Sequence, residues 1–435
     1  MPEARVALGD GKIPVGRLVF ETDGRRAHST FLYDERWLAN PFGFDLSPTM
    51  PRGRAAFHAG SGGRESRRRD VLAGAFADGA PDSWGRKLLR KTLGEGATEF
   101  DMLVLSDDFC RHGALRFLNE AGEPFPTDHS PVPRLTDIEA LRRLSARFER
   151  DPEGAGAEAR ALAGPAGSLG GARPKANVID GQDLWIAKFT SINDTWPVER
   201  LEVATLALAG SAGLRTPSAR LELAASDQPV ALIKRFDRRN GGRVPYISAR
   251  TALGKVGAAV GAYTDIADAL RTISVDPKGD MAELWARMVF GILVTNTDDH
   301  LKNHGLLYVR NNRWRLAPLF DVNPQPRRHP SDGDRDQPDP RRRTLDRRRD
   351  RRGAPLRYRP RPGAGAGAQR RPPVAQQLEI RPARPWRHGQ FARGMRSRLR
   401  TRTPGDGARA VISRRLIKRS PIAFGKARLS LKIVS

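Results

Sequence analysis

The stretch from Leu284 to Pro324, LWARMVFGILVTNTDDHLKNHGLLYVRNNRWRLAPLFDVNP, constrains this chain more than any other. An apolar segment leads into the polar turn TDDHLKN, a short hairpin follows, and an aspartate ends the apolar run PLFDVNP. Asp298 and Asn303 are five positions apart, and Asp321 lies 18 positions beyond Asn303. Phosphoryl transfer uses an Asp near the nucleophile, then an Asn and a second Asp that hold magnesium around the phosphates. The spacing therefore predicts the catalytic half of a kinase.

The formal net charge of +27 is spread very unevenly along the chain. Residues 325–435 hold 32 of the 76 Lys and Arg residues but only 8 of the 49 Asp and Glu residues, so they carry +24 of the total. Residues 1–324 are nearly neutral. The basic character therefore does not predict that the folded body binds nucleic acid. The tail itself has no aromatic interleaving and no recognisable nucleic-acid-binding module.

Cysteine usage and hydropathy indicate a cytoplasmic protein. Cys110 is the one cysteine of the sequence, so no intramolecular disulfide can form, which fits a reducing compartment. The N-terminus, MPEARVALGDGK, lacks the apolar core of a secretory signal, and no apolar run is long enough to span a bilayer. We therefore expect no contact with a membrane. The 435 residues suffice for two or three domains.

The N-terminal third predicts β structure followed by helices. Apolar or β-branched runs with Gly-Asp-Gly and Asp-Gly turns between them favour strands at Arg5–Leu8, Val15–Glu21 and Thr30–Tyr33. Residues 58–70 predict a mobile loop. The segment FADGAPDSWGRKLLRK, residues 76–91, predicts a packed helix with Pro81 in its first turn and Trp84 on its apolar face, and we assign it no chemistry. After a Pro-rich connection, a helix with Thr136 as its N-cap is expected.

Residues 163–189, AGPAGSLGGARPKANVIDGQDLWIAKF, predict a small-residue loop and a β-hairpin with an Asp180-Gly181 turn. Glycines let a backbone approach phosphate oxygens and present N–H groups to them. The loop has neither the GK[ST] ending of a Walker loop nor the GxGxxG of common protein kinases. By itself it is equally consistent with a flexible hairpin. Lys188 places a cation inside a strand, where a charge needs a partner.

A helix with Pro197 near its start and Gly213 at its end follows the hairpin. Glu199 and Glu202 are both candidate partners for Lys188, as a strand Lys and a helix Glu pair in kinases, and solvent exposure is the alternative for each. Two further strands lead through ALIKRF into a linker, where an adenine ring commonly lies. Residues 281–295 are apolar almost all round, which predicts a fully buried helix.

The composition changes abruptly at Gln325. The following residues are mostly Arg, Pro, Gly and Ala with few apolar anchors, a composition that cannot bury enough surface to offset ordering entropy. We expect disorder there. The predicted domains are a β subdomain (1–57), a helical portion and connection (58–134), a nucleotide-binding lobe (135–240), an incomplete catalytic lobe (241–324) and a disordered tail (325–435).

Taken together, these motifs resemble the HipA family of bacterial toxin-like serine/threonine kinases. TDDHLKN is similar to the family's catalytic turn, PLFDVNP to its metal-binding segment, GSLGGARPKA to its phosphate loop and WIAKF to its ATP-lysine strand. PDSWGRKLL and residues 5–57 resemble its N-terminal half. The resemblance implies an α+β, two-lobed protein-kinase-like fold with a small N-terminal β domain and a mostly helical C-terminal lobe.

The resemblance also implies a role for individual residues in binding ATP and Mg2+. Asp298 would be the catalytic base, and Asn303 and Asp321 the magnesium ligands. The nucleotide would be bound by a larger set of residues: Gly170, Gly171, Ala172, Arg173, Pro174, Lys175, Lys188, Lys234, Phe236, His300, Lys302, Asn303 and Asp321.

Ser168 and His300 have two interpretations each. Ser168 matches the serine that members of the family autophosphorylate, which ejects the loop and switches the kinase off; added negative charge beside a phosphate site gives the physical reason. It is otherwise a small turn residue. His300 would contact the nucleotide or, equally well, orient the turn as a hydrogen-bonded structural residue.

The tail departs from the family, whose members continue past the metal-binding Asp with ordinary helices. We hypothesise a reading-frame shift in a GC-rich gene, because such codons read out of frame give Arg, Pro, Gly and Ala. The catalytic lobe would then be truncated. Resequencing that found one intact frame, with the tail detected by mass spectrometry, would defeat this hypothesis.

Two other classes of function remain open. The chain could be a catalytically impaired subunit that binds a HipB-like, helix-turn-helix antitoxin and reaches DNA only through it. It could also be a small-molecule phosphotransferase, since the Asp-x4-Asn…Asp spacing occurs in antibiotic kinases, although the loop and the N-terminal domain argue against this. For a toxin kinase, the resemblance suggests a protein substrate in translation, such as an aminoacyl-tRNA synthetase.

Overall fold

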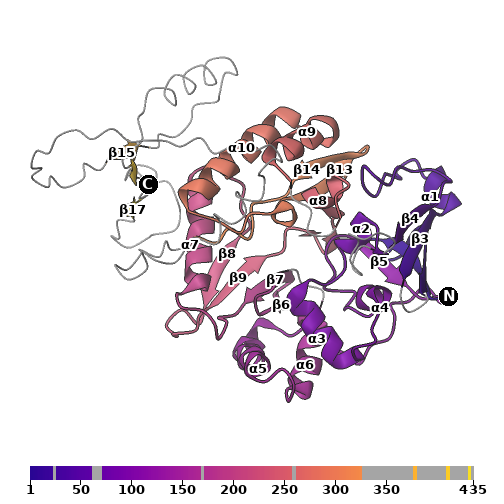
Figure 1. Ribbon diagram of the computed structural model, residues 1–435, viewed down its shortest axis with the longest axis horizontal. Coiled ribbons are helices and arrows are strands. Elements are labelled where there is room, and N and C mark those ends of the chain that lie inside the picture. Colours follow the sequence, from indigo (N-terminus) through magenta and orange to yellow (C-terminus); the bar gives the residue numbers. More distant parts are fainter. Residues whose placement is uncertain are drawn as a thin grey trace, which may run out of the picture. The chain divides into compact units, whose positions relative to one another are not determined.

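The computed structural model describes residues 1–22, 26–60, 71–167, 171–256 and 261–325, together with three short strands further on (Figure 1). Residues 1–324 belong to one compact unit. No helix among the described residues is long and apolar enough to cross a membrane. The fold is mixed α and β, in agreement with the predicted class.

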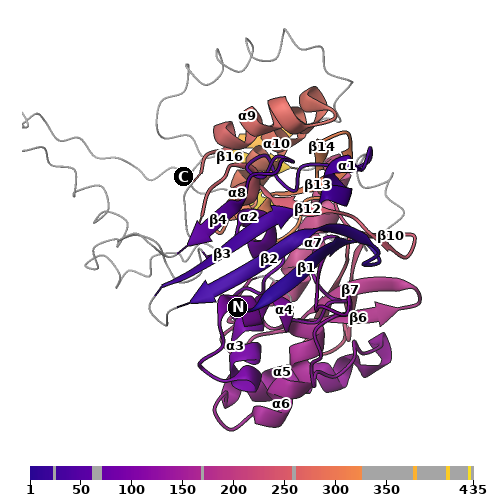
Figure 2. The same cartoon turned by 90° about the vertical axis from the view of Figure 1, so that its right-hand side faces the viewer.

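An antiparallel five-stranded sheet has the order β4-β3-β2-β1-β5, and Figure 2 shows β4, β3, β2 and β1 side by side. The strands predicted at Val15–Glu21 and Thr30–Tyr33 are confirmed and pair as β2 and β3, although the Asp23-Gly24 turn between them lies outside the described residues. One strand, β4, occupies the start of the segment expected to be a loop. The strands and the short helix that follows them are β1 (Glu3–Leu8), β2 (Ile13–Thr22), β3 (Ala27–Tyr33), α1 (Glu35–Ala39), β4 (Phe57–Gly60) and β5 (Leu115–Leu118).

Helices between these strands and the second sheet pack on one another. In both views α3, α5 and α6 lie together beside the strand β6 (Figures 1 and 2). The α3 helix begins at Ser83 with Asp82 at its N-cap, so Pro81 precedes the helix rather than entering its first turn. Similarly, Asp137 and not Thr136 stands at the N-cap of α5, because a 3-10 turn at Leu135–Asp137 comes first. The helices are α2 (Gly74–Ala77), α3 (Ser83–Leu93), α4 (Glu99–Val104), α5 (Ile138–Arg150) and α6 (Gly156–Ala166).

A second antiparallel sheet has the order β6-β7-β9-β8. The predicted hairpin of residues 175–189 is confirmed as β6 and β7, and the helix α7 packs against β8 and β9. Val178, Ala187 and Leu232 are fully buried and join α6 and Trp84 in one apolar cluster. These elements are β6 (Lys175–Asp180), β7 (Asp183–Lys188), α7 (Val198–Ser211), β8 (Ala219–Glu222) and β9 (Val230–Lys234).

The last part of the compact unit combines two small sheets with helices. A single apolar core joins it to the N-terminal sheet, since Leu18, Phe31 and Phe76 belong to the same cluster as Leu284, Leu306 and Trp314. The elements are β10 (Arg238–Arg239), β11 (Gly242–Arg243), β12 (Tyr246–Ser248), α8 (Ala249–Ala252), α9 (Tyr263–Ile273), α10 (Pro277–Leu293), the 3-10 turn at Leu301–Asn303, β13 (Gly305–Arg310) and β14 (Arg313–Leu316).

The prediction that the apolar helix before the catalytic turn is buried all round is wrong. In α10, Leu284 and Phe290 are buried, but Ile292 is 69% exposed. The helix packs against α9 and, through Phe290 and Val294, against Ala209 of α7. Hydrophobicity is a property of each side chain by itself. Whether a side chain is buried depends on which other elements pack around it.

Beyond Pro324 the structure describes Gln325 and three strands. The strand β15 (Gln376–Glu379) pairs parallel with β16 (Ala408–Val411), which pairs antiparallel with β17 (Ser430–Lys432). The remainder of the tail lies outside the described residues, so its disorder and the truncation of the catalytic lobe stay predictions.

Candidate active site

Four charges meet at the end of the β6–β7 hairpin: Lys175, Lys188 and Glu202 are buried, and the Asp321 side chain is 30% exposed. Register places Lys175 directly opposite Lys188, and like charges at such a position repel each other. Both lysines are buried, so each requires compensation from acidic groups. Lys188 Nζ lies 2.5 Å from Glu202 Oε1 of α7 and 2.5 Å from Asp321 Oδ1, at the end of the apolar run after β14. We call Lys175, Lys188, Glu202 and Asp321 the buried charge cluster.

Burial and mutual attraction shift the pKa values of this cluster in different directions. Burial alone would lower the pKa of Lys188, but Asp321 and Glu202 raise it above its usual value. Burial would raise the pKa of Asp321, yet Lys188 and Lys175 hold it well below its ordinary 3.8. Burial dominates at Glu202, whose pKa is raised, and at Lys175, whose pKa falls to about 8. The cluster therefore holds Lys188 charged and leaves Lys175 close to its titration point at neutral pH.

The structure separates the two glutamates that the sequence could not distinguish. Glu202 pairs with Lys188, while Glu199 accepts hydrogen bonds from Arg173 Nη2 at 2.8 Å and Thr190 Oγ1 at 3.0 Å. Arg173 also pairs with Asp194. Its guanidinium is thus bound to the start of α7, and it anchors the end of the glycine loop.

The catalytic turn is closed by its own asparagine. Asn303 Nδ2 donates to the main-chain oxygen of Asp298 at 2.8 Å, which sets the positions of both residues. Asp298 itself is exposed. The carboxylate of the next residue, Asp299, is less exposed. It pairs with buried His304 at 2.9 Å and accepts a hydrogen bond from Tyr263.

Asp321 reaches the cluster because the backbone turns sharply there. Its φ of +57° lies in the left-handed region, which aspartate tolerates better than most residues. An antiparallel bridge between Asn296 and Pro324 places the chain before the turn beside the chain after Asp321. His300 lies near enough to contribute to the low pKa of Asp321. The turn and the predicted metal-binding segment therefore lie together, as the spacing predicted.

The donor set fits a magnesium ion that arrives with a nucleotide. No group of three or more His, Cys, Asp or Glu side chains able to hold a metal occurs in the part of the chain that the structure describes. Magnesium in phosphoryl-transfer sites is typically held by one or two carboxylates together with substrate phosphates and water. Asn303 and Asp321 offer oxygen ligands of this kind, since Asn303 uses its amide nitrogen on Asp298.

The glycine loop lies against Lys175. Gly171 has φ +80°, and a Cβ on it would come within 2.7 Å of Lys175 Nζ, so the ammonium group packs directly on the loop backbone. Ala172 is exposed, and the oxygen of Pro174 accepts from the Phe189 amide at 3.0 Å. Two predicted residues of this loop, Ser168 and Gly170, lie outside the described residues.

The predicted adenine linker follows β9. Lys234 pairs with Asp183 at 2.6 Å and is partly exposed. The Phe236 ring centroid lies 5.4 Å from that of Phe320, the residue before Asp321, so the linker contacts the metal-binding segment.

Two residues that sequence reasoning left without chemistry touch this site. Asp82 accepts from the Gly171 amide at 3.3 Å and pairs with Lys302 of the catalytic turn. Trp84 donates from its indole to the Lys175 oxygen at 3.0 Å. The available signal was an Asp and a Trp two positions apart in the motif PDSWGRKLL, but the partners of both residues lie far away in sequence.

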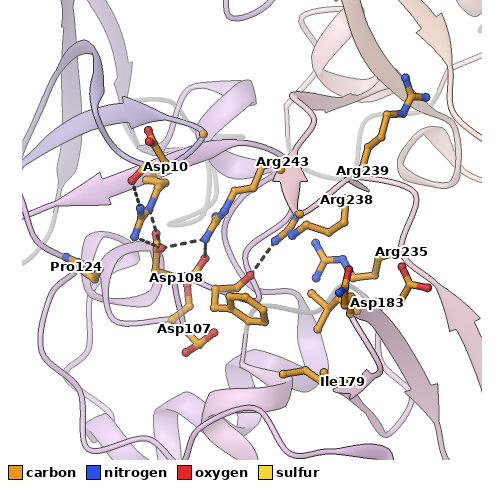
Figure 3. Close-up of a pocket in the computed structure, with 18 of the residues that line it drawn as sticks. Asp10, Asp107, Asp108, Pro124, Ile179, Asp183, Arg235, Arg238, Arg239 and Arg243 are labelled. Carbon is orange, nitrogen blue, oxygen red and sulfur yellow. Dashed lines mark hydrogen bonds and ion pairs between the residues drawn. The ribbon is translucent and has the colours of Figure 1, made fainter.

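A separate cavity of about 830 Å³ lies where the N-terminal sheet, the segment after α4 and the β10–β11 hairpin approach one another (Figure 3). Three of its arginines are held by groups of its own wall: Arg116 and Arg243 pair with Asp108, and Arg238 donates to the Phe109 oxygen. None of the predicted site residues lines it.

Comparison with known proteins places both halves of the chain in one family. Residues 5–116 match the HipA N-terminal domain, and residues 167–354 match the HipA-like C-terminal domain. Each matched range contains the motifs that carried the resemblance.

The chain is also similar to individual proteins. The chain is 28% identical to "Putative kinase Y4mE" of Sinorhizobium fredii, over 71% of this chain and 75% of that protein. The HipA toxin in a Shewanella oneidensis complex of HipA, HipB and operator DNA superposes with a TM-score of 0.50 and 18% identity, over 74% of this chain and 76% of that one. The Helicobacter pylori proinflammatory kinase CtkA gives a TM-score of 0.29 with 20% identity, over 34% of this chain and 54% of that one.

Proposed function

Because this chain belongs to the HipA family and has a kinase-like function, we propose that it is an ATP- and magnesium-dependent kinase that phosphorylates serine or threonine of a protein substrate. The observation that carries the proposal is the contact of Lys188 with both Glu202 and Asp321. It joins a strand of the second sheet, the helix α7 and the metal-binding segment, which is how kinases orient a phosphate-binding lysine.

The proposed reaction is an in-line transfer of the γ-phosphoryl group. The substrate hydroxyl oxygen forms a bond to the γ-phosphorus, while the bond from that phosphorus to the bridging oxygen of ADP breaks. Asp298 accepts the hydroxyl proton. Lys188 and the backbone of residues 170–175 hold the phosphates, and the linker at Lys234 and Phe236 holds the adenine. His300 and Lys302 lie on the turn where they reach the nucleotide.

Asn303 and Asp321 would hold magnesium. The ion supplies positive charge that offsets the charge developing on the phosphoryl oxygens. The low pKa of Asp321 keeps this ligand ionised at neutral pH.

A direct test is incubation of the full chain with γ-labelled ATP and magnesium. We expect label on the protein, with Ser168 as the modified residue in mass spectra, and a progressive loss of transfer to other proteins as Ser168 fills. Binding of nucleotide without any label would overturn the proposal in favour of an impaired binding subunit. Label on a small hydroxylated molecule alone would favour a small-molecule phosphotransferase.

Lys175 gives a prediction that does not depend on turnover. With a pKa of about 8, it is half protonated at pH 8 in the free protein. A bound polyanion raises that pKa, so the complex binds more protons than the free protein. ATP binding at pH 8 should therefore take up roughly 0.4 proton, and affinity should fall as pH rises above 8. Calorimetry in two buffers of different ionisation enthalpy measures this uptake. Equal uptake in Lys175→Gln would contradict the assignment.

We further propose a helix-turn-helix antitoxin as partner, with DNA contacted through it, because the Shewanella oneidensis relative was solved in such a complex. Pull-down with the product of the neighbouring gene tests this. A protein of translation, such as an aminoacyl-tRNA synthetase, is the proposed substrate, and labelling of a cell extract depleted of endogenous kinases tests it.

A further inference from the structure

The first turn of α3 touches the glycine loop on both sides of residues 168–170. Gly85 lies so close to the loop's start that a Cβ on it would meet the Gly167 oxygen at 2.4 Å. On the other side, the Trp84 amide donates to the Gly171 oxygen at 3.0 Å, and the Trp84 indole donates to the Lys175 oxygen at 3.0 Å. Trp84 is 1% exposed and packs edge-on against Phe148, so its indole is held in one position.

Asp82 stands at the N-cap of α3 but does not cap it. An N-cap aspartate usually accepts a hydrogen bond from the second or third amide of its own helix. Here no side-chain cap hydrogen bond is formed. The carboxylate instead accepts from the Gly171 amide at 3.3 Å and pairs through both oxygens with Lys302 Nζ. A local stabilising contact is given up for two contacts with distant parts of the chain.

These contacts connect the glycine loop to the catalytic turn through one residue. Lys302 follows Asp298 by four positions, and an ammonium group has three N–H donors. Two contacts to Asp82 orient the ammonium and leave donor capacity for a phosphate oxygen. Burial would raise the pKa of Asp82, but Lys302 outweighs it and holds that pKa below its usual value, so the Asp82 carboxylate stays ionised at neutral pH.

We propose that Asp82 and Trp84 are positioning residues that hold the phosphate loop in register with the catalytic turn, Asp82 through Lys302 and Trp84 through the loop backbone. The inference rests on the proposed kinase function. Nucleotide binding would then need α3 as well as the loop, and release of the loop would require these hydrogen bonds to break.

Hydrogen–deuterium exchange on the full chain tests the positioning directly. In Asp82→Ala and in Trp84→Phe, amides of residues 171–175 should exchange about tenfold faster, because each variant removes a hydrogen bond to this part of the loop. Two matched controls should leave that exchange unchanged. Glu153→Gln breaks an ion pair with Lys91 at the other end of α3. Trp185→Phe changes a buried tryptophan whose indole nitrogen has no hydrogen-bond partner among the described residues.

Kinetic measurements distinguish a positioning role of Asp82 from a role in stabilising the fold. Asp82→Ala should raise KM for ATP about tenfold with a smaller change in kcat, since it disorders the bound phosphates more than the reacting hydroxyl. The effects of Asp82→Ala and Lys302→Ala should be strongly non-additive, because the two residues act as one unit. Additive effects would overturn the link through Lys302.

The results can contradict the positioning role and the kinase function independently of each other. Unchanged exchange in a folded Asp82→Ala protein that still transfers phosphate overturns the positioning role and leaves the kinase assignment intact. Faster loop exchange in variants of a chain that transfers no phosphate supports the positioning role and overturns the proposed function instead.

Discussion

Replacing Asp298 with Asn is expected to slow phosphoryl transfer about a hundred- to ten-thousand-fold, the usual contribution of a positioned general base. The amide has nearly the shape of the carboxylate but cannot accept the substrate proton. Asn303 bonds to the main-chain oxygen of Asp298, so the turn should keep its form in the variant. Because Asp298 is exposed, unfolding temperature should barely change. Initial rates with labelled ATP and a thermal melt measure both effects.

The adjacent carboxylate provides the control. Asp299 pairs with His304, a residue only 4% exposed, and with Tyr263. Asp299→Asn should therefore mainly lower the free energy of unfolding and should change kcat little. If Asp299→Asn abolished transfer while Asp298→Asn remained active, the base would be Asp299 and the assignment of the turn would be wrong.

Replacing Lys188 with Met should both inactivate the protein and lower its free energy of unfolding by about 3–5 kcal/mol, as expected when one partner of a buried ion pair is removed. Glu202 and Asp321 would lose the cation that lies 2.5 Å from each of them. Chemical denaturation at pH 7 measures the loss.

The pH dependence of the Lys188→Met variant gives a second signature. In the native protein the pKa of Asp321 is below 3.8, so its contribution to stability is present above that pH and is lost on acidification. Without Lys188 the folded-state pKa values of both carboxyls should rise above their unfolded values. The folded variant then binds more protons than the unfolded chain, and its stability should increase as pH falls from 7 towards 5.

Lys91→Met is the matched control for this change. Lys91 pairs with Glu153, which is 93% exposed, and surface pairs contribute little. Its effect should stay below about 1 kcal/mol. A comparable loss in both variants would mean that Lys188 has no special role.

The local sequence pattern was sufficient to predict the hairpin at Lys175–Lys188 and the helix that carries Glu202, because turn residues and apolar periodicity act over a few positions. The same reasoning could not choose between Glu199 and Glu202. They are three positions apart on α7 and lie on nearly the same face, and only packing against the second sheet assigns one to Arg173 and the other to Lys188.

The burial prediction for α10 was wrong, and the contacts of Asp82 were missed, for a related reason. Ile292 and Leu284 are both strongly apolar, yet one is 69% exposed and the other is 2% exposed. Asp82 looks like a helix cap, but its partners Gly171 and Lys302 lie 89 and 220 positions away. No short-range signal reports such contacts.

The sequence by itself determined the chemistry available: the Asp298, Asn303 and Asp321 spacing, the glycine loop, the strand lysine and the family they resemble. Side-chain type and short-range spacing are properties of the chain alone. Only the tertiary structure decided which groups share a site. Ion pairs and buried charges depend on distances between elements remote in sequence, and the balance of burial against attraction then sets each pKa in the buried charge cluster.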